Sequence, residues 1–186
     1  MRVEFLGTGT STGVPMIGCR CDVCRSKDSR DRRLRSSVCL TVNDKNILID
    51  CGPDFRQQML RSGIDHIDAV LLTHEHYDHT SGLDELRNFS RNNPIPIYAE
   101  PNVLDIIHQR LFYCFSEQPN PGVAHLELKA IENLSPFTLF GIDIEPVRVW
   151  HYRLPIIGYR IGRFAYITDM LTIPDGECAK LSNLDT

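Results

Sequence analysis

The stretch LLTHEHYDHTSGL, at residues 71–83, decides the fold of this chain. It places three histidines and two acidic residues within six positions, directly after an apolar run. In an extended segment alternate side chains point the same way, so His74 and His76 can present their imidazoles to one point. Asp78 and His79 follow where we expect the chain to turn into a helix, and they can face a second point.

These residue types at this spacing predict a site for two divalent cations. Neutral imidazole and carboxylate suit Zn, Mn or Fe. Two such cations about 3.5–4 Å apart can hold the attacking and the leaving oxygen of a displacement reaction. A single histidine is more often a surface residue, or a core residue with its hydrogen bonds formed, than a metal ligand. Four ligand-type side chains in the HxHxDH pattern favour the metal site over chance clustering.

Three further candidates stand where predicted strands end. His151 follows the apolar run 142–150, Asp169 follows 164–168, and Asp50 closes 46–50. Each is a weak signal alone, but strand ends can meet at a common sheet edge. A carboxylate such as Asp169 can give one oxygen to each of two metals. We expect Asp50 to support the histidine loop by accepting hydrogen bonds.

The remaining pattern predicts an α/β (α+β) chain with two β-rich halves and helices between them, organised as a single domain over residues 1–186. The hairpin at 37–50 is indicated by two strand-like runs joined by NDK. We expect helices at 51–63, 81–91 and 102–115. The other expected strands lie at 2–7, 68–73, 94–100, 127–131, 137–140, 142–150, 156–161 and 164–168.

Composition and charge narrow the class of protein. Hydrophobic residues make up 42% of the 186 residues and charged residues 24%, which is typical of a globular protein. The net charge of -4 makes nucleic acid an unexpected partner. No leader-like apolar segment and no membrane-length apolar run are present, so we expect a cytoplasmic protein without a membrane partner. The sequence leaves the oligomeric state open, a homodimer included.

A basic run and a glycine-rich segment near the N-terminus do not by themselves predict a binding site. The basic run RSKDSRDRRLR, at residues 25–35, is read as a solvated loop rather than a groove for a polyanion. The glycines of GTGTSTGVP, at residues 7–15, do not have the spacing of a nucleotide-binding loop. They predict a tight turn near a functional cleft.

The motif THEHYDHTSGL, together with LIDCG before it and the later His151 and Asp169, resembles the signature of the metallo-β-lactamase superfamily. That resemblance covers nearly the whole chain and implies an αββα sandwich with a metal site at one edge. It also implies a ligand set. One metal is held by His74, His76 and His151, the second by Asp78 and His79, and both are bridged by Asp169.

A second cluster, GCRCDVC, supplies Cys19, Cys21 and Cys24 within a cysteine-rich loop at 18–35. Thiolates at CxCxxC spacing can surround one zinc, and a reduced loop without metal is the weaker alternative. Combined with GTGTSTGVP and THEHYDH, the cluster makes the chain similar to PhnP-type phosphodiesterases, which act on cyclic phosphates; proteins of PqqB type share a similar cysteine element. The PhnP-type resemblance implies a structural zinc on the three cysteines.

The chain departs from that family at its C-terminus. Relatives run on further and carry another histidine there for the second metal, and the PhnP type has one more for the structural zinc. The last histidine here is His151. We therefore expect the chain to be C-terminally incomplete; a segment supplied by a partner and an incomplete site are the alternatives.

The expected activity is hydrolysis of a small cyclic phosphate or other phosphodiester by a hydroxide bound to the metals, with Asp78 orienting the attacking water. Alternative activities are a thioesterase and an RNA-processing nuclease. A β-lactamase and an oxygen-reducing di-iron protein fit the sequence less well. A non-catalytic metal-binding module is the alternative from another class.

Overall fold

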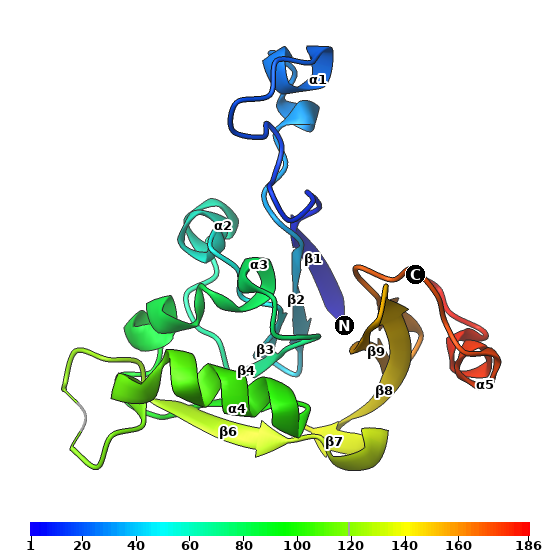
Figure 1. The fold of residues 1–186 in the computed structure, drawn as a ribbon. Helices are drawn as coiled ribbons and strands as arrows, with labels where there is room; N and C mark the ends of the chain where they lie inside the picture. The colour runs from blue at the N-terminus through cyan, green and yellow to red at the C-terminus, as the bar shows by residue number, and fades with distance from the viewer. Residues whose placement is uncertain (119) are drawn as a thin grey trace.

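The computed structural model describes residues 1–118 and 120–186, which form two β-sheets packed face to face with helices outside them (Figure 1). The first sheet has the order β1-β2-β3-β4-β5-β6, and the second has the order β10-β9-β8-β7. The strands of the first sheet are β1 (Arg2–Gly7), β2 (Ser37–Val42), β3 (Lys45–Ile49), β4 (Ala69–Leu71), β5 (Ile95–Ala99) and β6 (Leu126–Ala130). The second sheet contains β7 (Phe137–Leu139), β8 (Ile142–His151), β9 (Leu154–Ile161) and β10 (Phe164–Tyr166).

Every predicted strand is present, with its ends within two residues of the expected ones. The predicted hairpin is the β2–β3 pair, whose turn residues Asn43 and Asp44 have φ angles of 49° and 59°. Positive φ at both central residues matches the right-handed twist of the flanking strands, and Asn and Asp tolerate it best after glycine.

The first sheet changes from antiparallel to parallel pairing at β3. Strands β3, β4, β5 and β6 run parallel, and Ile49 lies opposite Leu71 at the carboxyl ends of β3 and β4. Residues that follow these two strands therefore emerge at the same edge of the sheet. This edge carries Asp50 and the histidine loop.

Alternating side chains of the first sheet fill two separate cores. Leu48, Val70 and Ile97 pack against the helices on the outer face. On each strand, the neighbouring side chains point to the opposite face, into the core between the two sheets. That core contains Val38, Leu40, Ile47, Ile49, Leu71, Ile144, Ile157, Tyr159 and Ile161.

The helices confirm the predicted layers but are shorter than expected. The outer layer on the first sheet contains α2 (Phe55–Ser62), α3 (Tyr77–Thr80) and α4 (Pro101–Arg110). The helix predicted at 81–91 is present but shorter, and it is a 3-10 helix that spans Leu83–Asn88. Its apolar residues recur every third position, which matches three residues per turn rather than 3.6. The helix predicted at 102–115 ends at Arg110 and is followed by a 3-10 turn at Phe112–Cys114.

The outer face of the second sheet contacts α5 (Asp175–Cys178), a single helical turn. Val147, Val149 and Ile156 form a small core there, against which Ile173 and Leu181 pack. Together with the two sheets and the outer helices, this layer gives the predicted αββα arrangement.

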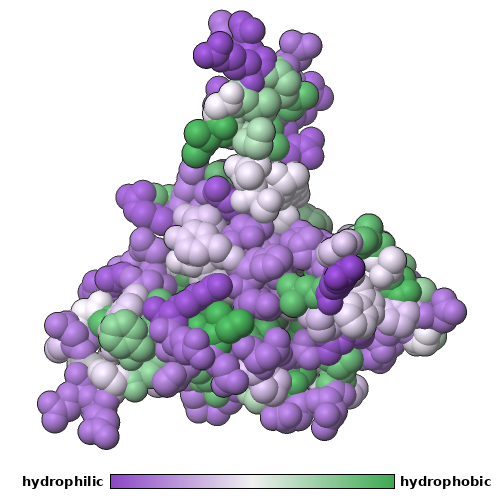
Figure 2. Space-filling view, viewed as in Figure 1, coloured by the Kyte–Doolittle hydropathy of each residue, from purple (hydrophilic) through white to green (hydrophobic). Residues whose placement is uncertain are grey.

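The segment between β1 and β2, residues 8–36, projects from the body and is called the Cys arm below (Figure 1). It contains α1 (Asp22–Arg25) and a 3-10 turn at Ser29–Asp31, and bridges from Gly9 to Arg35 and from Val14 to Arg33 join its two sides. Its outer end carries mostly hydrophilic residues with a smaller apolar area beneath (Figure 2). Across the described residues, no helix is both long enough and apolar enough to cross a bilayer.

Candidate metal centre

The histidine loop follows β4 at the edge where the parallel strands end. His74 is fully buried, His76 immediately precedes α3, and Asp78 and His79 lie within that helix. The helix turns the chain, so its two ligand-type side chains face the pair that precedes it. The side-chain rings of His74 and His76 have centroids 4.6 Å apart, and those of His74 and His79 are 4.3 Å apart.

Two residues from the second sheet complete the cluster. His151 is the last residue of β8, and its ring centroid lies 5.3 Å from that of His76 and 5.9 Å from that of His74. Asp169 follows β10 with a φ angle of 53°. Its Oδ2 lies 3.6 Å from Nε2 of His74 and 3.1 Å from Nε2 of His79. The structure thus brings together all the candidate ligands that the sequence placed at distant strand ends.

The ligand atoms form two groups with one member in common. His74, His76 and Asp169 offer donor atoms within 4.8 Å of one another, and so do Asp78, His79 and Asp169. His151 stands beside the first group. Because Asp169 belongs to both groups, its carboxylate occupies the position that a bridging ligand would need.

Asp50 lies beneath the cluster, fully buried. Its carboxylate accepts the backbone N–H of Thr73 at 2.9 Å, the hydroxyl of Thr73 at 3.0 Å and Nδ1–H of His79 at 2.7 Å. These bonds fix the start of the histidine loop and direct Nε2 of His79 toward the cluster.

Thr73 is a residue that sequence reasoning missed. Since its hydroxyl donates to Asp50, its oxygen accepts Nδ1–H of His74 at 2.9 Å. Nε2 of His74 then carries a lone pair directed into the cluster. The only sequence signal was its position immediately before the histidines.

Two glycines allow the loops to approach closely. A Cβ on Gly52 would lie 2.0 Å from the carbonyl oxygen of Asp78, and a Cβ on Gly82 would lie 2.2 Å from the carbonyl oxygen of Gly52. The backbone N–H of Cys51 donates to the carbonyl of His79 at 2.7 Å across this contact. Side chains at either glycine would therefore push α3 away from Asp50.

The electrostatics of the cluster are dominated by burial and by the three carboxylates. Burial, together with the charge of the neighbouring His79, lowers the pKa of His74 to about 4. Burial alone would also lower the pKa of His79, but the charges and hydrogen bonds of Asp50, Asp169 and Asp78 outweigh it and raise the pKa to about 12. The hydrogen bond from His79 lowers the pKa of Asp169 to about 2, against the effect of burial.

The cluster fits divalent cations. Nε2 of His74 is a buried nitrogen without a hydrogen-bond partner in the part of the chain that the structure describes, which is costly unless a ligand satisfies it. The surrounding donors are imidazole nitrogens and carboxylate oxygens, the set that Zn, Mn and Fe accept.

The cysteine cluster lies in the Cys arm, far along the chain from these residues. Cys19, Cys21 and Cys24 place their sulfurs within 4.8 Å of one another, and all three are free thiols. Hydrogen bonds from the backbone of Cys24 and from neighbouring thiols lower the pKa of Cys21. The three thiols are close enough together to act as ligands of one zinc ion.

Two arginines, Arg35 and Arg148, form ion pairs that join separate parts of the fold. Arg35 donates Nη1–H to Asp54 at 2.9 Å, and Arg148 donates Nη1–H to Glu100 at 2.8 Å. Both pairs are largely shielded from solvent. They fix the Cys arm to the start of α2 and the second sheet to the start of α4.

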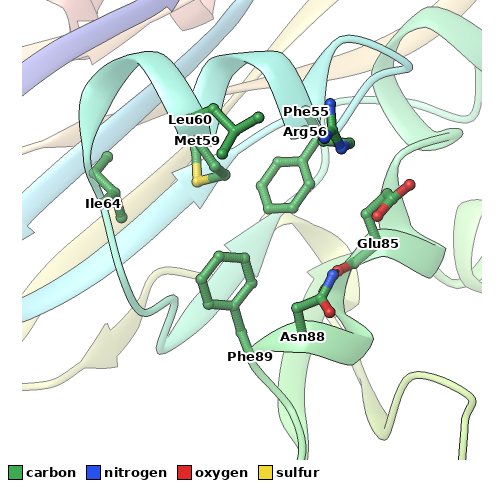
Figure 3. Close-up of a pocket in the computed structure, with 8 residues that line it drawn as sticks. All are labelled: Phe55, Arg56, Met59, Leu60, Ile64, Glu85, Asn88 and Phe89. Atoms are coloured by element: carbon green, nitrogen blue, oxygen red, sulfur yellow. The ribbon is translucent and has the colours of Figure 1, made fainter.

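A separate apolar cleft of about 280 Å³ lies between α2 and the 3-10 helix (Figure 3). The rings of Phe55 and Phe89 face each other across it, with centroids 6.0 Å apart. None of the residues that line it is a candidate metal ligand.

Comparison with known proteins places these features in a family. A sequence profile described as "Beta-lactamase superfamily domain" matches residues 45–186. The chain is 52% identical to a protein of Porphyromonas gingivalis named octanoyltransferase, over 99% of this chain and 38% of that protein. The chain therefore spans well under half of the length of that curated relative.

Two solved structures are similar over the whole chain. The crystal structure of a new diphosphatase from the PhnP family has a TM-score of 0.90 and 41% identity, over 98% of this chain and 70% of that one. Zinc-bound PqqB from Methylobacterium extorquens has a TM-score of 0.78 and 25% identity, over 100% of this chain and 71% of that one. The ligand cluster at the sheet edge agrees with the divalent metals that this fold implies. The chain belongs to the family of beta-lactamase superfamily domains, whose fold is that of metal-dependent hydrolases.

Proposed function

We propose that this chain carries the metal centre of a phosphodiesterase that hydrolyses a small cyclic phosphate or another small phosphodiester. The observation that carries the proposal is Asp169, which belongs to both groups of ligand atoms. The similarity to a PhnP-family diphosphatase supports phosphorus chemistry over other ester hydrolysis. A net charge of -4 supports a small substrate rather than a nucleic acid.

The positions of the ligand atoms support the following roles. His74, His76 and His151 would hold one cation, Asp78 and His79 would hold the second, and Asp169 would be within reach of both. When bound, such a pair lowers the pKa of a coordinated water toward about 7 and offsets the negative charge that develops on the phosphoryl oxygens. Zinc or manganese, with iron as a further choice, suits this donor set.

The surrounding residues prepare these ligands. Thr73 fixes the tautomer of His74, and Asp50 fixes that of His79, so that each Nε2 faces the reaction centre. Asp78 is partly exposed, and its carboxylate lies 3.2 Å from Nε2 of His79. It is placed to accept a hydrogen bond from the attacking water and to orient it.

We assign the three cysteines of the Cys arm to a structural zinc. Their sulfurs are arranged around one point, and α1, which begins beside them, has no buried residue to stabilise it. A zinc bound there would supply the stability that the arm's small core lacks.

Hydrolysis of bis(p-nitrophenyl) phosphate by the metal-loaded protein tests the proposal. The variant His76→Ala removes one ligand and should lower the rate by at least about 10²-fold, because the lost cation no longer stabilises transition-state charge. His108→Ala, which changes an exposed histidine on α4, is the matched control. Equal rates for His76→Ala and the control, or turnover of thioester or RNA in place of the phosphodiester, would refute this assignment.

A further inference from the structure

The base of the Cys arm contains two adjoining cavities outside the metal centre. Their volumes are about 430 and 410 Å³. Both are lined by Arg32, Arg33 and Leu34 from the arm and by Arg61 from α2. We call this double cavity the arginine groove. It is built from three stretches of the chain, within residues 5–15, 29–35 and 54–61, that meet only in the folded protein.

The charge of the groove is strongly unbalanced. Five arginines line it, whereas Asp54 is its one carboxylate. Two of these arginines are neutralised locally: Arg30 pairs with Asp28, with Nη2 and Oδ2 2.6 Å apart, and Arg35 pairs with Asp54. The groove is therefore positive within a chain whose net charge is -4.

The other three arginines keep an uncompensated charge. Over residues 1–118 and 120–186, no carboxylate forms an ion pair with Arg32, Arg33 or Arg61. Neutral carbonyls hold two of them in place: Arg33 donates Nε–H to the carbonyl of Arg30 at 3.1 Å, and Arg61 donates to the carbonyl of Leu6. Such contacts position a guanidinium without cancelling its charge.

We propose that the arginine groove binds the phosphate groups of a small polyphosphorylated molecule. Guanidinium groups bind phosphate oxygens through two parallel N–H···O bonds and hold water less tightly than ammonium groups do. Two adjoining cavities that share three unpaired arginines can accept neighbouring phosphate groups. A long nucleic acid would extend beyond the groove onto a surface of net negative charge, which disfavours it.

The groove is distinct from the metal centre, because none of its lining residues is a candidate metal ligand. The proposal therefore does not depend on the phosphodiesterase activity. It gives the basic run at 25–35 a binding role that the interpretation as a solvated loop did not include. The groove includes Arg61 of α2, which lies outside the basic run.

Calorimetric titration of the full chain with inorganic tripolyphosphate tests the proposal. The double variant Arg32→Gln/Arg33→Gln should weaken binding about tenfold or more, since it removes charge-assisted hydrogen bonds from the bound phosphates. Arg61→Gln should weaken binding in the same direction. The matched control Arg20→Gln/Arg25→Gln removes the same charge from exposed positions of the same arm and should change binding less than about threefold.

Three results would overturn the proposal. The first is equal weakening by the groove variants and the control, which indicates diffuse electrostatic attraction. The second is loss of binding in His76→Ala with retention in Arg32→Gln/Arg33→Gln, which places the phosphates at the metal centre. The third is tighter, groove-dependent binding of single-stranded oligothymidylate than of tripolyphosphate, which assigns the groove to nucleic acid. Equal melting temperatures of all variants exclude unfolding as the cause of any difference.

Discussion

The carboxylate of Asp50 accepts Nδ1–H of His79 at 2.7 Å, while Nε2 of the same ring lies 3.1 Å from Asp169. One imidazole therefore connects a fully buried acid to the carboxylate shared by both ligand groups. The first sheet supplies Asp50 and the second sheet leads to Asp169, so this chain of contacts also spans the interface between the sheets. Several expectations depend on it.

Replacing the buried acid should weaken metal binding without removing a ligand. In Asp50→Asn the carboxamide is a weaker acceptor, so His79 becomes less basic and less firmly oriented. The affinity for the second cation should fall about 10–100-fold. Metal titration of the purified protein measures this change.

The matched control is Asp68→Asn, at the other end of β4. Asp68 is partly buried, with 16% of its side chain exposed, and accepts the backbone N–H of Asn46 and the ammonium of Lys45, each at 2.8 Å. Its loss should lower the free energy of unfolding but leave metal affinity unchanged. If both variants weaken metal binding alike, general destabilisation rather than orientation of His79 is the cause.

The shared carboxylate should affect both cations, whereas its neighbour should affect one. Asp169→Asn removes the charge that contacts both ligand groups, so the metal content at the histidine cluster should fall for both sites. Asp78→Asn should deplete the second site alone. Elemental analysis of protein at equal loading distinguishes them, with His108→Ala as the unchanged reference. Identical losses in the two aspartate variants would argue against a bridging role for Asp169.

The cysteine cluster should bind metal independently of the histidine cluster. Cys21→Ser removes one of three thiolates, so zinc at the Cys arm should be lost while the histidine cluster keeps its content. Backbone amides of residues 16–31 should then exchange hydrogen faster, because the arm has little core of its own. Cys178→Ser, which changes the exposed cysteine at the end of α5, is the control. An equal zinc loss in that control would contradict the assignment.

Local patterns predicted those parts of the fold and site that depend on neighbouring residues. The strands, the β2–β3 hairpin and the loop at 74–79 follow from apolar runs and turn residues. The partners of Arg35 and Arg148 could not be predicted, because they lie 19 and 48 positions away and are chosen by tertiary packing. Thr73 was missed for another reason. The role of its hydroxyl depends on contacts with Asp50 and His74 that only the folded structure shows.

The pair formed by Arg148 and Glu100 should contribute to the contact between the sheets. Glu100 follows β5 and Arg148 lies in β8, and both side chains are less than one-fifth exposed. A double-mutant cycle with Arg148→Ala and Glu100→Gln should give a coupling energy of about 1–2 kcal/mol in urea unfolding, below the value of a fully buried pair. The exposed pair of Arg163 and Asp185 should give a coupling near zero. Equal coupling in the two cycles would contradict a structural role for burial here.

The stability of the α5 contact should depend on pH through Glu177. Its carboxylate accepts the backbone N–H of Arg148 at 2.8 Å and lies 2.9 Å from the ammonium of Lys180. Burial opposes ionisation, but these two partners outweigh it, and the pKa of Glu177 is lowered. A carboxyl group with a lowered pKa stabilises the folded state above its unfolded pKa of about 4.3, and this contribution is lost as the pH falls through the folded value.

Wild type should therefore be more stable than Glu177→Gln by about 1 kcal/mol at pH 7, and the difference should shrink as the pH falls from about 5 to 3. Lys180→Met should reduce the same pH dependence from the other side of the ion pair. Urea unfolding of metal-stripped protein at each pH measures the differences without interference from metal release. A difference between wild type and Glu177→Gln that stays constant with pH would show that the glutamate acts through packing, because the amide retains its shape but cannot ionise.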